Sequence, residues 1–163
     1  MKGQKYIFLK IVLLLPPPNF KDVTMTGKLT FTMIKPSAVA AGHAGDILAM
    51  IEKAGFRLVA MKLIHLSRHQ AGLFYAEHNG KSFYEDLTRF MSSGPIIAAI
   101  IAKDDAVAEF RKLIGATDPA KAEKRTVRNL YGKSITENAV HGSDADATAE
   151  REGNFFFSSI ENV

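Results

Sequence analysis

The unbroken apolar run from Ile96 to Ala102, IIAAIIA, is the feature that most constrains the fold of this chain. The turn-forming residues Ser92-Ser93-Gly94-Pro95 precede it, and charged residues follow it. A short run of this kind is typical of a central strand that is buried on both faces. A chain of 163 residues, of which 47% are hydrophobic, is long enough to cover such a strand within one domain.

The segment Leu29 to Ile34, LTFTMI, alternates apolar and polar residues and predicts a half-buried strand that ends at Lys35-Pro36. The other expected elements are a helix over 46–54, a strand over 56–66, a helix over 68–78 capped by Ser67, a following helix capped by Ser82, a helix over 105–114 capped by Asp104, a strand over 139–141 and a short helix after Asp144. Residues 116–137 form a polar, basic stretch without a clear pattern, and long irregular connections are often functional.

This order of elements predicts an α+β fold. We expect a ferredoxin-like α/β sandwich in which a four-stranded antiparallel sheet is covered by helices, and we expect those helices on one face.

The net charge of +4 is concentrated near the N-terminus. Residues 1–24 hold four lysines against Asp22, which leaves 17 basic and 16 acidic residues for the rest of the chain. A nearly neutral domain disfavours a nucleic acid partner, because backbone binding needs an excess of Lys and Arg. The absence of cysteine excludes a disulfide framework and a cysteine nucleophile, and it fits a cytoplasmic protein.

The segment Tyr6 to Leu15, YIFLKIVLLL, is apolar but contains Lys10 and runs into Pro16-Pro17-Pro18. It is shorter than the roughly 20 residues that a membrane-spanning helix needs. It has the basic start and apolar middle of a secretory signal, yet no clear cleavage site follows. We therefore expect residues 1–24 to be an extension, disordered or not native, and residues 25–163 to be the functional domain. A targeting segment is the alternative.

Phosphate binding by a P-loop is excluded, because Gly132-Lys133-Ser134 has the right ending but Val127 stands where the first glycine is required. If this protein handles phosphates, side chains must bind them. The candidates are Lys35, Arg111, Thr117, Arg128, Asn138 and His141. Taken singly, each of them has an ordinary packing or surface role, and their spacing alone does not bring them together.

Six separated stretches point to one family. They are TFTMIKPSAV, GFRLVAMK, FYAEH, MSSGPIIAAI, FRKLIGATDPA and NAVHGSD. In their order and spacing, these stretches resemble nucleoside diphosphate kinase, and the resemblance covers about residues 29–157.

The resemblance implies a phosphate relay centred on His141. This histidine would take the terminal phosphate from a nucleoside triphosphate and pass it to a nucleoside diphosphate in a ping-pong cycle. Glu152 would bond the second ring nitrogen, Ser143 would support it, and Tyr75 would stand close by. A carboxylate in that place fixes the tautomer and steadies the charge of the phosphohistidine.

The resemblance also implies the nucleotide site. Its ligands would be Arg111, Thr117 and Arg128 for phosphate, Lys35 and Asn138 for sugar hydroxyl and phosphate, His78 for phosphate, and Phe83 opposite Ile135 for the base. Stacking leaves the hydrogen-bonding edge of the base unread, so broad base and sugar tolerance is expected. Mg²⁺ would arrive mostly bound to the nucleotide phosphates.

Two features depart from the family pattern. Ser37 follows the Lys-Pro pair where the family usually has Asp, which we expect to alter local packing but not catalysis. The chain ends at Val163, soon after Phe155-Phe156-Phe157, so the expected homo-oligomer is either a hexamer or a tetramer. A regulatory or nucleic-acid-binding protein on the same fold is the alternative function, and the matched site residues favour the enzyme.

Overall fold

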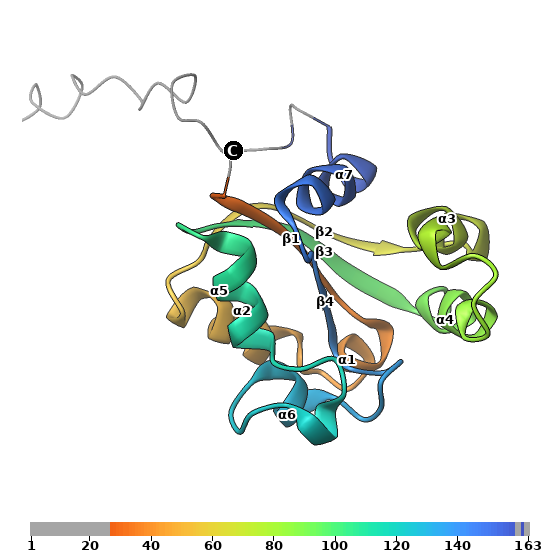
Figure 1. Ribbon diagram of the computed structural model, residues 1–163, viewed down its shortest axis with the longest axis horizontal. Coiled ribbons are helices and arrows are strands. Elements are labelled where there is room, and N and C mark those ends of the chain that lie inside the picture. The colour runs from red at the N-terminus through yellow and green to blue at the C-terminus, as the bar shows by residue number, and fades with distance from the viewer. Residues whose placement is uncertain (1–26, 159–160, 162–163) are drawn as a thin grey trace, which may run out of the picture.

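The computed structural model describes residues 27–158 and 161, so the expected N-terminal extension lies outside the described residues. Its centre is a four-stranded antiparallel sheet in the order β2-β3-β1-β4 (Figure 1). The strands are β1 (Leu29–Ile34), β2 (Arg57–His65), β3 (Pro95–Ala102) and β4 (Val140–Gly142). The prediction for the apolar run is confirmed, because β3 lies between β2 and β1 in the sheet.

Helices cover both faces of the sheet. They are α1 (Pro36–Ala40), α2 (Ala44–Lys53), α3 (Arg68–Phe74), α4 (Tyr84–Met91), α5 (Ala106–Ile114), α6 (Val127–Tyr131) and α7 (Asp146–Phe156), with 3₁₀ turns at Ala76–His78 and Pro119–Lys121. Figure 1 shows α3, α4 and α7 on one side of the sheet and α2 and α5 on the other.

The expectation of helices on one face is therefore wrong. The physical reason is that successive residues of a strand point to opposite faces of the sheet, and in the central strands both sets of residues include apolar side chains. Phe31 and Ile100 belong to the core beneath α3, α4 and α7, whereas Ile34 and Ile101 belong to the core shared with α2 and α5. The sheet would expose one of these sets to water if either layer of helices were missing.

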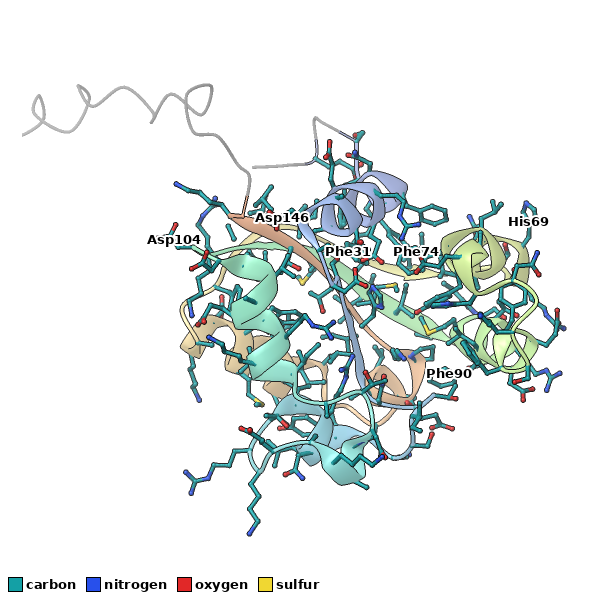
Figure 2. All side chains as sticks on the ribbon, in the orientation of Figure 1. Phe31, His69, Phe74, Phe90, Asp104 and Asp146 are labelled. Atoms are coloured by element: carbon teal, nitrogen blue, oxygen red, sulfur yellow. The ribbon has the colours of Figure 1, made fainter. Side chains whose placement is uncertain are left out.

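The core on the α7 side is rich in aromatic rings. Phe31 on β1 and Phe74 at the end of α3 lie side by side near α7, with ring centroids 5.9 Å apart (Figure 2). Phe156 stacks on Phe31 with centroids at 5.2 Å. This packing joins the sheet, α3 and α7, and so it fixes where the ends of α3 and β4 lie relative to each other.

Several helix boundaries differ from those expected. Ser67 caps α3 as predicted and forms a capping box with Gln70. The helix ends at Phe74, however, and a 3₁₀ turn replaces its expected last residues. Among the described residues, neither Ser82 nor Asp104 caps a helix, since Phe83 and Asp105 precede α4 and α5 and make no side-chain capping bond.

Two short helices were not expected. Pro36 occupies the first turn of α1, where its fixed φ suits a helix start. The second is α6, which lies inside the stretch predicted to be irregular, as does the Pro119–Lys121 turn. Five-residue helices carry too little periodic pattern to be predicted from sequence.

Gly142, at the end of β4, leaves no room for a side chain. A Cβ atom there would lie 2.9 Å from carbons of Phe110 and Ile114, which are both fully buried. We expect Gly142→Ala to lower the free energy of unfolding by about 1–3 kcal/mol, because overpacking forces these side chains from their rotamers. Urea denaturation measures this change.

Gly45 is the matched control, because an added Cβ there meets nothing within 4 Å. Gly45→Ala lies within α2 and is expected to keep or raise stability. Equal stability of the two variants would contradict the prediction.

Candidate active site

His141 is the middle residue of β4, opposite Met33 of β1. The chain enters β4 through Ala139, whose φ of 67° lies in the left-handed region that a residue with a Cβ rarely adopts. The backbone amide of Lys35 donates to the Ala139 carbonyl at 2.8 Å and holds this conformation. Strained backbone of this kind tends to occur at functional sites.

A carboxylate orients the imidazole. The His141 Nε2 atom lies 2.9 Å from the Glu152 Oε2 atom of α7, and the Ser143 hydroxyl donates to the same oxygen at 2.6 Å. Because an ionised carboxylate only accepts hydrogen bonds, Nε2 carries the proton and Nδ1 keeps a free lone pair. The side chain of Glu152 is 5% exposed and that of His141 is 20% exposed, so this pair is held in a largely dry environment.

Three aromatic rings surround the imidazole of His141. The ring of Phe74 meets it edge to face with centroids 5.5 Å apart, that of Phe31 lies at 6.1 Å and that of Tyr75 at 6.2 Å. Packed rings resist rotation of the imidazole about its side-chain bonds. The histidine is therefore aimed by packing as well as by its hydrogen bond.

A cavity of about 400 Å³ opens in front of His141. The cavity brings together residues whose proximity could not be predicted from their spacing in the sequence. Of the predicted site residues, those lining it are Lys35, Tyr75, His78, Phe83, Arg111, Thr117, Arg128, Ile135, Asn138, His141 and Glu152. Ser143 is buried, is not among the lining residues and reaches the site through its hydrogen bond to Glu152. A cavity of this size suits a small organic ligand.

Two buried cations face this cavity. Lys35 is 6% exposed and donates to the Thr136 carbonyl at 3.1 Å. Burial, and secondarily the charge of Arg128, lowers the pKa of Lys35 to about 7. Arg128 donates to the Gly115 carbonyl at 2.9 Å, and burial with the charge of Arg111 lowers its pKa to about 10. Near pH 7, Arg128 is thus charged and Lys35 titrates.

Several buried polar atoms of the cavity have no hydrogen-bond partner within the described part of the chain. These atoms are the hydroxyl of Tyr75, Nε of Arg128 and Oδ1 of Asn138. Such atoms are rare in folded proteins and are costly unless a ligand or water satisfies them. By contrast, the amide nitrogen of Asn138 donates to the Thr117 carbonyl at 3.0 Å, which holds its oxygen in place.

The cavity also exposes apolar surface. Phe83 is 48% exposed and Ile135 is 61% exposed, although both are large and hydrophobic. The ring of Phe83 lies 5.5 Å from that of His78. Exposed aromatic surface in a polar cavity is a platform on which a flat ring can stack.

Four further polar residues line the cavity that sequence reasoning did not assign to the site, namely Glu77, Thr136, Asp144 and Thr148. Glu77 and Asp144 lie within the quoted stretches FYAEH and NAVHGSD. Thr148 is four residues beyond Asp144, and its side chain donates a hydrogen bond that lowers the pKa of the Asp144 carboxyl.

The acidic side chains of the cavity are already engaged by protein groups. Glu77 pairs with Arg151, Asp144 accepts from Thr148, and Glu152 holds the histidine. In the part of the chain that the structure describes, no group of three or more His, Asp or Glu side chains could hold a metal ion. This donor set does not favour a resident metal.

Comparison with known proteins decides the family. The sequence model described as nucleoside diphosphate kinase matches residues 28–162. The chain belongs to the nucleoside diphosphate kinase family. It is an enzyme that transfers phosphate between nucleotides by the ping-pong phosphohistidine mechanism of this family.

Individual relatives agree. The nucleoside diphosphate kinase of Flavobacterium psychrophilum is 53% identical over 137 residues, which is 84% of this chain and 99% of the relative. That of Sorangium cellulosum is 52% identical over 81% of this chain and 92% of its own length. Among solved structures, the Aquifex aeolicus nucleoside diphosphate kinase has a TM-score of 0.81 with 36% identity, over 83% of this chain and 99% of its own.

The expected family, fold and activity are therefore confirmed, whereas the roles of single residues remain predictions. Lys35 lines the cavity, and Ser37 follows it by two residues where the resemblance led us to expect Asp. Over the residues that the structure describes, every helix is too short or too polar to span a membrane.

Proposed function

We propose that His141 is the phosphate carrier of this enzyme and that Nδ1 is the attacking atom. The observation that carries this proposal is the hydrogen-bond chain from Ser143 through Glu152 to Nε2 of His141, at the edge of a cavity with buried cations. This chain leaves Nδ1 with its lone pair available, as a nucleophile requires.

The reaction runs in two half-reactions. The Nδ1 lone pair attacks the terminal phosphorus of a nucleoside triphosphate, the bond to the bridging oxygen breaks, and that oxygen leaves with the nucleoside diphosphate. A second diphosphate then attacks the same phosphorus, and the electron pair of the P–N bond returns to Nδ1. Between these steps the phosphorylated imidazole is positively charged, and the carboxylate of Glu152 stabilises it.

The cations and donors of the cavity serve the phosphates. Arg111, Arg128, Lys35 and Thr117 would contact the phosphate oxygens, and His78, which also lines the cavity, would contact phosphate as well. Oδ1 of Asn138 would accept from a sugar hydroxyl, and the Tyr75 hydroxyl would donate near the transferred phosphate. Support for these roles comes from the unpartnered state of both atoms.

The base would stack between Phe83 and Ile135. Support for this position comes from the exposure of both side chains. Support for a nucleotide ligand comes from the structure of a halophilic nucleoside diphosphate kinase from Halobacterium salinarum in complex with CDP, which has a TM-score of 0.80 and 38% identity over 83% of this chain and 90% of its own. A stacked base is not read at its hydrogen-bonding edge, so several bases and both sugars should be accepted.

Mg²⁺ would enter with the nucleotide and neutralise phosphate charge, since the acids of the cavity are engaged elsewhere. We further propose a cytoplasmic homo-oligomer, hexamer or tetramer, whose catalytic domain is residues 25–163. Intact-mass measurement of the natively expressed protein would determine whether residues 1–24 are retained.

Trapping the intermediate tests the proposal. The purified protein is incubated with Mg-ATP labelled on its terminal phosphate, without an acceptor. We expect acid-labile, base-stable label on His141 that GDP or dCDP discharges. A folded protein that binds nucleotide but takes up no label would overturn it.

The low pKa of Lys35 predicts a pH dependence of nucleotide affinity. Phosphate binds the charged ammonium better than the neutral amine, and the free site loses this charge as the pH rises through about 7. We expect the Kd for ADP to rise about tenfold between pH 7 and pH 8.5. Isothermal titration measures it, with Lys35→Met as the control that should show a flat profile over this range. A parallel rise in both proteins would instead assign the effect to another group.

A further inference from the structure

Arg151 on α7 stands between two carboxylates of the cavity. Its Nη2 atom lies 3.0 Å from Oε2 of Glu77 and 4.0 Å from Oε1 of Glu152. Glu77 lies in the 3₁₀ turn that follows α3, and Glu152 holds His141 through its other oxygen. Both glutamates line the cavity.

Stability does not account for this arrangement. The side chains of Arg151 and Glu77 are 54% and 47% exposed, and exposed ion pairs stabilise folded proteins little. The Arg89–Asp86 pair on α4 is comparably exposed, with 66% and 73%, and its residues are not among those that line the cavity. The Arg151–Glu77 pair is thus an exposed ion pair like Arg89–Asp86, and it differs in that Glu77 lines the cavity.

The position matters because the proposed ligand is a polyanion. An unpaired Glu77 carboxylate at the cavity would repel nucleotide phosphates. It would also compete for a predicted phosphate ligand, since Oε1 of Glu77 is already 3.8 Å from Nε2 of His78. A charge of this kind at the mouth of a binding site acts over several ångströms and weakens with salt.

The Glu152 carboxylate would also repel nucleotide phosphates, but the site requires this charge because it fixes the tautomer of His141. The cavity therefore needs acidic groups and must still admit an anion. A cation at the rim that contacts both glutamates meets both demands. The raised pKa of the Tyr75 hydroxyl, caused first by burial and then by the charges of Glu152 and Glu77, is consistent with the field of these carboxylates extending into the cavity.

We propose that Arg151 is a positioning residue for nucleotide binding. It neutralises Glu77 and Glu152 at the cavity rim, and it ties the turn that carries His78 to α7. This inference rests on the proposed function, because it takes the ligand to be a nucleoside di- or triphosphate.

A double-mutant cycle tests the inference. The Kd for ADP is measured by isothermal titration at low and high salt for the parent, Arg151→Gln, Glu77→Gln and the double variant. We expect Arg151→Gln to weaken ADP binding about three- to tenfold at low salt, because it leaves Glu77 unpaired. The double variant should regain most of this loss but stay short of the parent's affinity, because Glu152 still lacks the cation beside it, and the loss should shrink at high salt.

Arg89→Gln is the matched control and should leave the Kd unchanged. If Arg151→Gln binds ADP as the parent does, or if the double variant binds as poorly as Arg151→Gln, the inference is wrong while the proposed function stands. A parent protein that neither binds ADP nor transfers phosphate would overturn the proposed function and this inference with it.

Discussion

Replacing His141 with glutamine is expected to lower kcat by at least about 10⁴-fold, because the substitution removes the nucleophile of both half-reactions. Glutamine keeps a polar side chain of similar length beside Glu152, so no large cavity forms among the surrounding aromatic rings. The melting temperature should therefore stay within a few degrees of the parent value, about what a change of 1 kcal/mol produces. A coupled assay of nucleoside diphosphate formation measures kcat, and circular dichroism measures the fold.

His69→Gln is the matched control for this substitution. His69 is an exposed residue of α3 that points away from the core in Figure 2 and is not among the cavity residues. It should retain full activity. Substantial turnover by a folded His141→Gln protein would show that another residue carries the phosphate.

The central part of the fold was predictable because its signal is local. The apolar run of β3 and the alternation of β1 each specify their burial within a few residues. Helices close to α2 and α5 were predicted, but their place on the second face of the sheet was not. Ile34 and Ile101 look like parts of ordinary strands in the sequence, and their shared core with α2 and α5 appears only when the strands pair.

The site was predictable through the resemblance and not through spacing. Arg111 and Asn138 lie far apart in the sequence, and the sheet with α5 brings them to one cavity. Two features had no local signal. The pairing of Glu77 with Arg151 joins residues 74 positions apart, and the low pKa of Lys35 depends on burial by segments that are distant in the chain.

Removing the negative charge of Glu152 should have the second-largest effect. Oε2 of this residue accepts from both Ser143 and Nε2 of His141. In Glu152→Gln, an amide group can present a donor to Nε2, which then moves the ring proton to Nδ1 and removes the nucleophilic lone pair. The charge that stabilises the phosphorylated imidazole is lost as well. We expect kcat to fall about 10²-fold with little change in the Kd for ADP.

The nitrogen that carries phosphate gives a second measurement. Because the tautomer is no longer fixed, part of the phosphate in Glu152→Gln should appear on Nε2, and ³¹P NMR of the labelled protein distinguishes the two isomers. Glu150→Gln is the control, since this exposed residue of the same helix is not among the cavity residues. An unchanged kcat, with all phosphate still on Nδ1, would mean that the surrounding aromatic rings orient His141 without help from the carboxylate.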